Sequence, residues 1–416
     1  MPVVSAVSAI TAAEHRRPRP CENLKGAGSG NPVDDRRGAP FCDPADSQGA
    51  ALILNPGRGR IDGDHYLPVT GETSRWGWWP NRRSAPVMSV DSGAVLTVDT
   101  LSHEGILEDQ GRDPAAFFGA RGIDRSGVLD DAVEMAADVP HTFGVDGPHV
   151  VTGPVEVRGA EPGDLLRVDV LGFALRVPYG VTSNRHGLGA LPGEMPDGAE
   201  PADTLTPGSG HGTVSVFTEV EGDARAGTAV LRYGTGGAVR YPIAPFLGMM
   251  GVSADVDEPV ATRPPGRHGG NLDIKHLVQG TTLYLPVQVP GAGFAVGDPH
   301  FAQGNGEVAL TALEGSLRAD LRLSVLRGPE AREACGLIEN PFGETDDHWI
   351  PVGLHADLDE AMREAVREAL RFCESRLGLP RHIAYAYLSC AADFEVTQVV
   401  NEIKGVHCLI AKRDFR

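Results

Sequence analysis

The 416-residue sequence predicts a mainly β protein: a sandwich-like β body followed by an α+β C-terminal module. The chain has 53 glycines and 32 prolines, and its β-branched residues fall into short runs between Gly, Pro and Asp turns. Many short strands joined by tight turns give a sequence this composition. Helical periodicity is concentrated near the C-terminus, which indicates a module of mixed α and β structure there.

The sequence divides into three regions. Residues 1–50 mix Pro, Gly, Ser and charged residues without periodicity, which is typical of a flexible lead segment. Residues 51–330 form the expected β-rich body, which holds the candidate catalytic residues, and residues 331–416 form the C-terminal module. The chain exceeds the length at which one hydrophobic core usually stops growing, so more than one domain is expected.

Strands of the body are expected where β-branched or alternating residues lie between turn signals: 51–57, 86–102, 163–175, 212–220, 227–233, 280–289 and 315–328. One helix is expected over 125–139, because Val128, Leu129, Ala132, Val133 and Ala136 share a face. Residues 191–212 are rich in Pro, Gly, Asp and Thr, which predicts a long surface loop.

The C-terminal module contains the clearest helix signal of the chain. Over residues 357–378, apolar side chains recur at three-and-four spacing and Gly378 stands where a helix stop is favoured. A second helix is expected over 380–394, with strands at 396–400 and 405–411.

Charge and hydropathy exclude several function classes. The formal net charge is -19, which repels nucleic-acid backbones and anionic lipid, so neither is an expected partner. No uncharged apolar run approaches the 18 residues or so that a spanning helix needs, and the first residues lack the charge order of a secretory signal. A cytoplasmic location is expected.

The densest polar cluster, RPPGRHGGNLDIKHL, contains His268, Asn271, Asp273 and His276. Its paired glycines allow the backbone to approach a ligand closely, so the cluster favours a polar pocket wall. The alternative is a surface turn in which Asn271 and Asp273 cap the backbone.

A second cluster, VGDPHFAQGNGEV, contains Asp298, His300, Gln303, Asn305 and Glu307. A strand and a turn separate the two clusters, so they are expected to meet at a sheet edge. Together they supply the imidazole and carboxylate groups that hold a divalent metal and activate water at neutral pH.

Two further histidines are weaker candidates. His103 lies in TLSHEGILEDQGRD after an expected strand end, where charged residues are often only a solvated loop. His149 precedes an expected strand, where a lone histidine is more often packed or hydrogen-bonded than catalytic.

The sequence contains no GxSxG, HExxH or GxxxxGK motif and no GxGxxG that opens a helix. It therefore gives no support to serine esterase, zincin or nucleotide-dependent chemistry. Six cysteines occur without a CxxC pair, so reduced thiols are expected. Cys335 or Cys390 as a nucleophile stays an alternative to metal chemistry, although a buried cysteine is more often inert packing.

The sequence resembles the acetamidase/formamidase family in GPHVVTGPVEVRGAEPGDLLRVDVL, RYPIAPFLGMMGV, TRPPGRHGGNLDIKHL, GTTLYLPVQVPGAGFAVGDPHFAQGNGEV and AYAYLSCAADFEVTQVVNEIKGVHCLIAK. The resemblance runs from about residue 60 to the end. It implies hydrolysis of a small linear carboxamide to carboxylate and ammonia, a homo-oligomer, and a divalent metal, with zinc the first choice and calcium the second. The chain departs from the family at Asn305, where QGNGE replaces QGDGE, and at His103, where many relatives carry Asp.

The combined hypothesis gives each candidate a role. The metal ligands are drawn from His268, Asp273, His276 and His300, and Glu307 with Asp298 carries the proton transfer. The residues assigned to the substrate are Asn271, Gln303, His103 and His149. The alternatives are a cysteine-dependent amide hydrolase and a non-catalytic β-sandwich that binds small amides.

Overall fold

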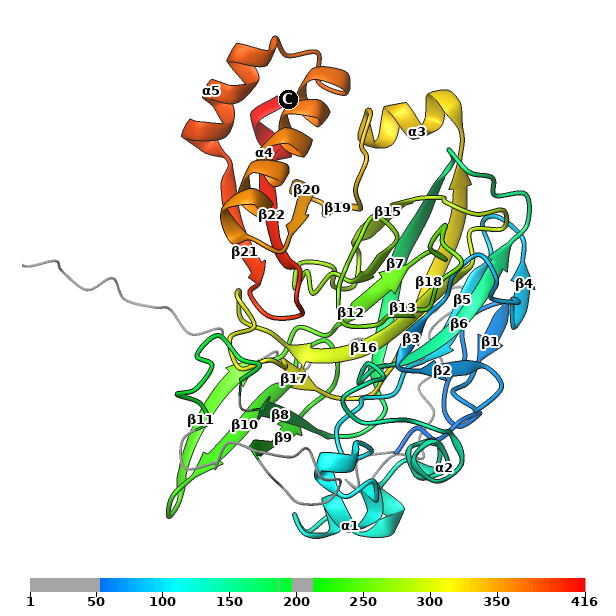
Figure 1. Cartoon of the computed structure of the whole chain (residues 1–416), viewed down its shortest axis with the longest axis vertical. Helices are drawn as coiled ribbons and strands as arrows, with labels where there is room; N and C mark the ends of the chain where they lie inside the picture. The colour runs from blue at the N-terminus through cyan, green and yellow to red at the C-terminus, as the bar shows by residue number, and fades with distance from the viewer. Residues whose placement is uncertain (1–52, 186, 197–211, 416) are drawn as a thin grey trace, which may run out of the picture. The chain divides into compact units, whose positions relative to one another are not determined.

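The computed structural model describes residues 53–185, 187–196 and 212–415, which belong to one compact unit that begins at Ala50 (Figure 1). The predicted lead segment, residues 1–50, lies outside the described residues, as does the 197–211 part of the predicted loop. The described residues form two large sheets and one two-stranded sheet.

The first sheet has nine strands and runs from the body into the C-terminal module. Its order is β1 (His65–Leu67), β5 (Val95–Asp99), β18 (Leu317–Leu326), β7 (Leu165–Leu175), β15 (Thr282–Pro286), β19 (Phe342–Glu344), β20 (His348–His355), β22 (Lys404–Ala411) and β21 (Asp393–Gln398). Strands β7 and β18 form its longest antiparallel pair. Along β18 the buried residues Leu317, Ala319, Leu321, Leu323 and Val325 include most of its apolar side chains, as expected of a strand packed against a core.

The second sheet has eleven strands, and its central members carry the candidate site. Its main path is β11 (Gly237–Pro242), β10 (Thr228–Tyr233), β9 (Thr213–Glu221), β8 (Tyr179–Arg185), β17 (Leu313–Glu314), β16 (Phe294–Ala302), β12 (Phe246–Gly251) and β14 (Gly269–Asn271). Strand β6 (Val150–Val157) pairs with β16, with β2 (Ser74–Trp76) and with β4 (Met88–Val90). The small sheet pairs β3 (Trp78–Trp79) with β13 (Val260–Ala261).

The two large sheets share one hydrophobic core. Its buried side chains include Leu96 of β5 and Leu321 of β18 from the first sheet, and Val155 of β6 and Phe294 of β16 from the second. Two short helices, α1 (Pro114–Gly119) and α2 (Asp130–Asp138), lie near one end of the body in Figure 1. Packing against this shared core helps to fix β16 in the second sheet, where it lies between β17 and β12.

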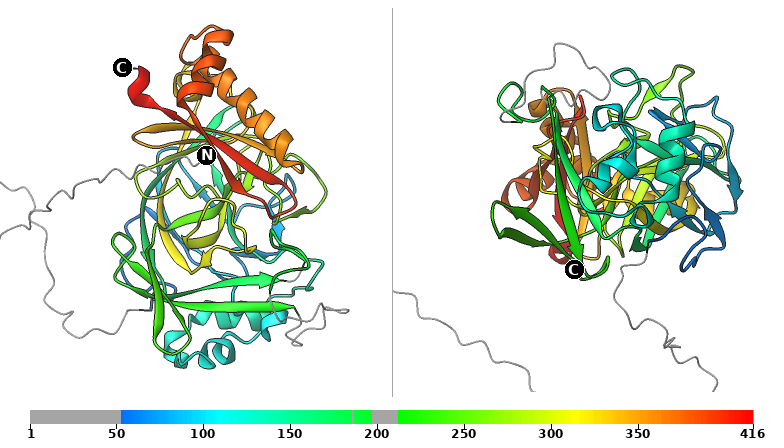
Figure 2. Two further views of the ribbon diagram at one scale, coloured as in Figure 1. Left: turned by 90° about the vertical axis from the view of Figure 1, so that its left-hand side faces the viewer. Right: turned by 90° about the horizontal axis from the view of Figure 1, so that it is seen from below.

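The C-terminal module contains α3 (Gly328–Cys335), α4 (Leu358–Ser375) and α5 (Arg381–Ala391) together with β19 to β22. Helices α4 and α5 lie beside these strands in Figures 1 and 2 and enclose a second core around Phe372 and Ile410. Asp357 caps α4 by accepting a hydrogen bond from Glu360 N. Gly353 of β20 lets α4 approach closely, because a Cβ there would lie 2.2 Å from Ala361 O.

The mainly β prediction is confirmed, and α4 and α5 correspond to the two helices expected in the module. The strand expected over 51–57 is wrong for its described part: residues 55–57 form a turn, because the Asn-Pro-Gly sequence favours one. The helix expected over 125–139 is shorter and begins at Asp130. Within the described ranges, we find no helix with the length and hydropathy needed to cross a membrane.

Candidate functional site

Strand β16 carries the centre of the site. Asp298 and His300 are two residues apart on this strand, a spacing that places side chains on one face. His300 Nε2 lies 3.2 Å from Asp298 Oδ2 and 3.1 Å from Oε1 of Glu314 on β17, and all three side chains are buried. On the other side of the ring, His300 Nδ1 lies within hydrogen-bond distance, 3.0 Å, of Gln303 Oε1. This bond fixes the orientation of the imidazole.

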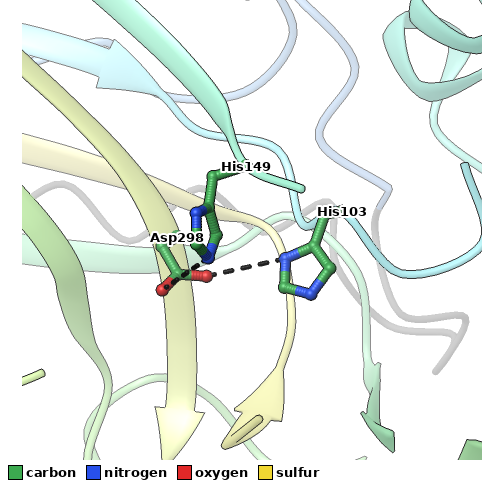
Figure 3. Close-up of side chains that lie close together, drawn as sticks. All are labelled: His103, His149 and Asp298. Carbon is green, nitrogen blue, oxygen red and sulfur yellow. Dashed lines mark ion pairs between the residues drawn. The ribbon is translucent and has the colours of Figure 1, made fainter. Parts of the chain in front are cut away.

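Two histidines from distant parts of the chain converge on the same carboxylate (Figure 3). His103 Nδ1, from the segment after β5, lies 3.6 Å from Asp298 Oδ1, and His149 Nε2, just before β6, lies 3.6 Å from Asp298 Oδ2. The side chains of His103, His149 and Asp298 are only 3%, 6% and 4% exposed. His103, His149 and Asp298 therefore form a buried triad, and this name is used below.

Two more carboxylates, Asp273 and Glu307, are held by the segment that follows β21. Asn401 Nδ2 donates a hydrogen bond to Asp273 Oδ2 over 2.9 Å and lies 3.5 Å from Glu307 Oε2. Gln303 Nε2 donates to Asp273 O over 2.9 Å. The residues predicted around 298–307 thus lie beside Asp273, and the C-terminal module contributes Asn401.

Four side chains of the site sit on backbone with positive φ: Asp273 (53°), Asp298 (51°), Glu307 (46°) and Asn401 (62°). Few residues other than glycine adopt this conformation, and Asp and Asn tolerate it better than Glu does. Residues held in this region cluster at functional sites, where surrounding structure maintains the strain. The backbone of this site is therefore shaped for the placement of these side chains.

Burial and neighbouring charges move the pKa values of these groups apart. Burial raises the pKa of Glu307 well above its ordinary value, and the nearby Asp273 raises it further. Burial likewise raises the pKa of Asp273 to about 8. Asp298 is different: burial would raise its pKa, but His149 and His300 outweigh burial and hold it well below the ordinary value.

The histidines of the triad also differ. Burial disfavours the charged ring of His103, but the carboxylates of Asp298 and Glu104 outweigh burial and raise its pKa to about 10. Burial lowers the pKa of His149 to about 4, helped by the charges of His103 and His300. His149 is therefore a neutral imidazole at pH 7, the form that binds metal ions, whereas His103 is protonated and would have to release its proton to bind one.

The donor set fits a divalent metal. His103 Nδ1, Asp298 Oδ1 and His300 Nε2 are buried and have no hydrogen-bond partner, although oppositely charged groups lie close by. The triad places one ligand atom from each residue within 4.8 Å of the others, and Asp273, Asp298 and His300 form an overlapping group of the same kind. Two imidazoles with a carboxylate suit zinc better than calcium, which prefers oxygen ligands only.

A cavity of about 440 Å³ opens onto the triad. Its lining includes His103, His149, Asn271, Asp298 and Glu307. Apolar walls come from Leu107, Phe143, Pro148, Leu188 and Leu310. The cavity thus combines a polar end with an apolar body, as ligand pockets usually do.

Two of the predicted metal ligands lie elsewhere. His268 is partly buried near Trp79, with ring centroids 5.8 Å apart, and does not line the cavity. His276 lies with Glu395 and His407 in a separate cluster. Both histidines are close to Asn271 and Asp273 in sequence, but His268 lies in the turn before β14 and His276 in a turn after it, and neither side chain lines the cavity.

Sequence reasoning missed Glu314 and Asn401. Glu314 interrupts the apolar run around LTALEG, and a lone carboxylate in a buried strand is a signal that could have identified it. Asn401 is recognisable only from the fold, because the sequence around it is an ordinary polar turn.

Neither candidate cysteine lines the cavity. Cys335 is fully buried in the core of the module, where burial raises the pKa of its thiol well above the ordinary value, and Cys390 is exposed on α5. A buried thiol with a raised pKa is a poor nucleophile. The geometry thus favours the His and carboxylate centre over cysteine chemistry.

The β fold thus buries clustered histidines and carboxylates, which could hold a metal ion, beside a partly apolar cavity. The model of the Acetamidase/Formamidase family matches residues 238–411 of the chain. That region contains β14, β16 and the loop with Glu307.

Similar proteins cover different shares of the chain. The formamidase of Methylophilus methylotrophus is 28% identical over 223 residues, which are 43% of this chain and 52% of the relative. The acetamidase of Mycolicibacterium smegmatis is 29% identical over 239 residues, 47% of this chain and 57% of the relative. The chain thus spans about half the length of the curated relatives it matches. The crystal structure of an acetamidase from Bacillus halodurans superposes with a TM-score of 0.62 at 27% identity, covering 84% of this chain and 98% of that one.

Proposed function

We propose that the protein hydrolyses the C–N bond of small linear carboxamides, releasing a carboxylate and ammonia, and that the cavity above the triad is its active centre. The observation that carries the proposal is the convergence of His103, His149, Asp298 and Glu307 on one cavity. The match to the Acetamidase/Formamidase family model and the similarity to a solved acetamidase support the choice of amides as substrates. A cytoplasmic location and a homo-oligomeric state stay predictions.

Amide hydrolysis needs help at three points, because the carbonyl is resonance-stabilised and the amine leaves poorly. Water must be activated, the developing oxyanion stabilised, and the leaving nitrogen protonated. A divalent metal, zinc by the donor set, would be held by the triad and would supply carbonyl polarisation and a lowered pKa of water. In this proposal the triad takes the place of the ligands expected from the sequence, because His268 and His276 do not line the cavity.

Glu307 is proposed as the group that takes a proton from water and delivers it to the leaving nitrogen. It lines the cavity, and burial with the charge of Asp273 raises its pKa, which makes its carboxylate a stronger base. The hydrogen-bond network of Asn401 sets its position relative to Asp273.

Asn271 is proposed to bind the substrate amide. Its Nδ2 donates a hydrogen bond to Arg263 O over 3.2 Å, while its buried Oδ1 has no hydrogen-bond partner. Because Asn271 lines the cavity, this acceptor suits a carboxamide N–H donor. Gln303 is a positioning residue instead, since its amide is engaged by His300 and Asp273.

The size of the cavity bears on the substrate. Pockets of about 300–1,000 Å³ hold drug-sized ligands, so 440 Å³ exceeds what formamide or acetamide occupies. The apolar walls at Leu107, Phe143 and Leu310 suit an aliphatic or aromatic acyl group. We expect ammonia release from formamide, acetamide and carboxamides with larger apolar acyl groups.

The substitution Glu307→Gln tests the proposed proton transfer. Ammonia release should fall by about 10²–10⁴-fold, the usual contribution of a general acid–base, while thermal stability and metal content stay unchanged. Glu368→Gln is the matched control, because Glu368 is also buried but lies on α4, outside the cavity lining. Wild-type turnover by the Glu307→Gln variant would remove Glu307 from this role.

Metal removal tests the other half of the proposal. Dialysis against a strong chelator should abolish ammonia release, and Zn²⁺ should restore it better than Ca²⁺ does, because two ligands are imidazoles. Full activity in protein shown by elemental analysis to be metal-free would refute metal assistance. A non-catalytic amide-binding protein would bind amides in both states and release no ammonia in either.

A further inference from the structure

His276, Glu395 and His407 form a cluster that the proposed reaction does not use. Glu395 on β21 and His407 on β22 are directly paired in the antiparallel register, which places their side chains on one face. His276 comes from the body, shortly after β14, and reaches the same face. The cluster therefore joins the C-terminal module to the β body.

The ligand atoms of the three side chains lie within 4.8 Å of one another. His276 Nε2 lies 2.9 Å and His407 Nε2 3.2 Å from the same oxygen, Glu395 Oε2. Two ligand atoms on a tetrahedral zinc, each at about 2.0–2.1 Å from the ion, are about 3.3 Å apart. The observed separations are close to this value.

A hydrogen bond to Nδ1 of His407 orients the ring so that Nε2 can bind a metal ion. Its Nδ1 is hydrogen-bonded to Thr397 Oγ1 at 2.6 Å, the outer partner that fixes the ring of a metal-binding histidine. Its Nε2 is fully buried and has no aligned hydrogen-bond partner, although Glu395 lies close. Asn305 Nδ2 and His276 already donate to Glu395 Oε2, so a network of hydrogen bonds alone leaves His407 Nε2 unsatisfied.

We propose that His276, Glu395 and His407 bind a second divalent cation of the zinc class, separate from the cavity. The side chains of His276 and Glu395 are 28% and 26% exposed, so an ion can enter and water can complete its coordination. A cleft of about 530 Å³, lined by His276, Lys275 and Gln303 among others, opens beside the cluster. This inference does not depend on the proposed amide hydrolysis.

An ion in this position would stabilise the contact between β21 and the loop that carries Glu307. Gly306 N donates to Thr397 O over 3.1 Å, and Val399 N donates to Gly306 O over 3.0 Å. Asn305, which precedes Gly306 in the same loop, donates a hydrogen bond from its Nδ2 to Glu395 Oε2 over 2.8 Å. The second ion would therefore stabilise the loop and the module together rather than take part in chemistry.

The test compares metal stoichiometry and Zn²⁺ affinity of the full chain and of Glu395→Gln, each with and without Asp298→Asn. Glu395→Gln should hold one ion fewer per chain in both backgrounds, and the Zn²⁺ affinity of the second site should fall at least about 10-fold. In the Asp298→Asn background, Zn²⁺ should raise Tm, and this shift should vanish in the double variant. Loss of an ion only on Asp298→Asn would support the proposed active centre and overturn this second site.

His276→Gln provides a second variant in case Glu395→Gln fails to fold. Glu344→Gln is the matched control, because Glu344 is similarly exposed, lies in the same module and pairs with Lys412 outside the cluster. Co²⁺ substitution reports the site independently, since its absorption spectrum changes when an imidazole ligand is lost. If folded His276→Gln and Glu395→Gln both keep the wild-type stoichiometry and affinity, or if the wild-type chain binds no ion there, the proposal is refuted.

Discussion

Replacing Gly248 by alanine should disable the proposed centre while leaving the fold in place. Gly248 lies on β12, which pairs with β16. A Cβ at this position would lie 2.7 Å from Asp273 Oδ1, 2.8 Å from His300 Cε1 and 2.9 Å from Asp298 Oδ2. The φ of Gly248 is not in the positive range, so alanine would not strain the backbone. The added methyl group would only collide with these side chains. The substitution thus acts on the site alone.

The magnitude follows from the contact distances. The optimal separation of non-bonded carbon atoms is about 3.5–4.0 Å, so the side chains of Asp273, Asp298 and His300 must each move by about 0.6 Å or more. Overpacking of this kind costs about 1–3 kcal/mol of stability. Displacements approaching 1 Å in a catalytic centre cost about 100-fold in rate. We therefore expect the free energy of unfolding to fall modestly and ammonia release to fall about 100-fold.

The assay measures ammonia release, Tm and bound metal for Gly248→Ala and for the control Gly119→Ala. Gly119 ends α1, where an added Cβ meets no atom within 4 Å, so this variant should match the wild type. Wild-type turnover by Gly248→Ala would show that Asp273, Asp298 and His300 do not act together, and the proposed centre would have to be abandoned.

Two predictions concern the fold. Arg318→Met should cost about 3–5 kcal/mol in denaturant unfolding, because Asp99, fully buried and 2.7 Å from Arg318 Nε, would lose its main cationic partner; an unchanged midpoint would contradict this. Phe372→Ala should cost about 3–5 kcal/mol, because Phe372 is fully buried between Phe342 and Trp349. Calorimetry checks the second value, and a loss below about 1 kcal/mol would show that the module core collapses around the cavity.

The fold was predictable where one periodicity dominated. Residues 357–378 carry a long three-and-four pattern, and α4 follows it closely because Ala361, Ala365 and Phe372 all face the strands. The strand expected over 51–57 failed because two signals competed over a few residues. There Leu54 is buried and its backbone N–H bonds to Arg176 O, but the turn at 55–57 prevents a strand.

The site was predictable only in part, for a geometric reason. Asp298 and His300 share a strand face, so local spacing is enough to bring them together. His276 is near Asp273 in sequence, yet its partner Glu395 is 119 positions away, and no local pattern links the two. Glu314 reaches the site because β17 pairs with β16, and Asn401 reaches it from the turn between β21 and β22, neither of which a single sequence reveals.

Strand β19 pairs with β15, so the first sheet crosses from body to module without interruption. A fragment ending near residue 330 would leave Thr282–Tyr284 as an unprotected edge, with open N–H and C=O groups that recruit other chains. Such a fragment should precipitate on expression. It would also lack Asn401, so we expect the body alone to lack the proposed hydrolase activity.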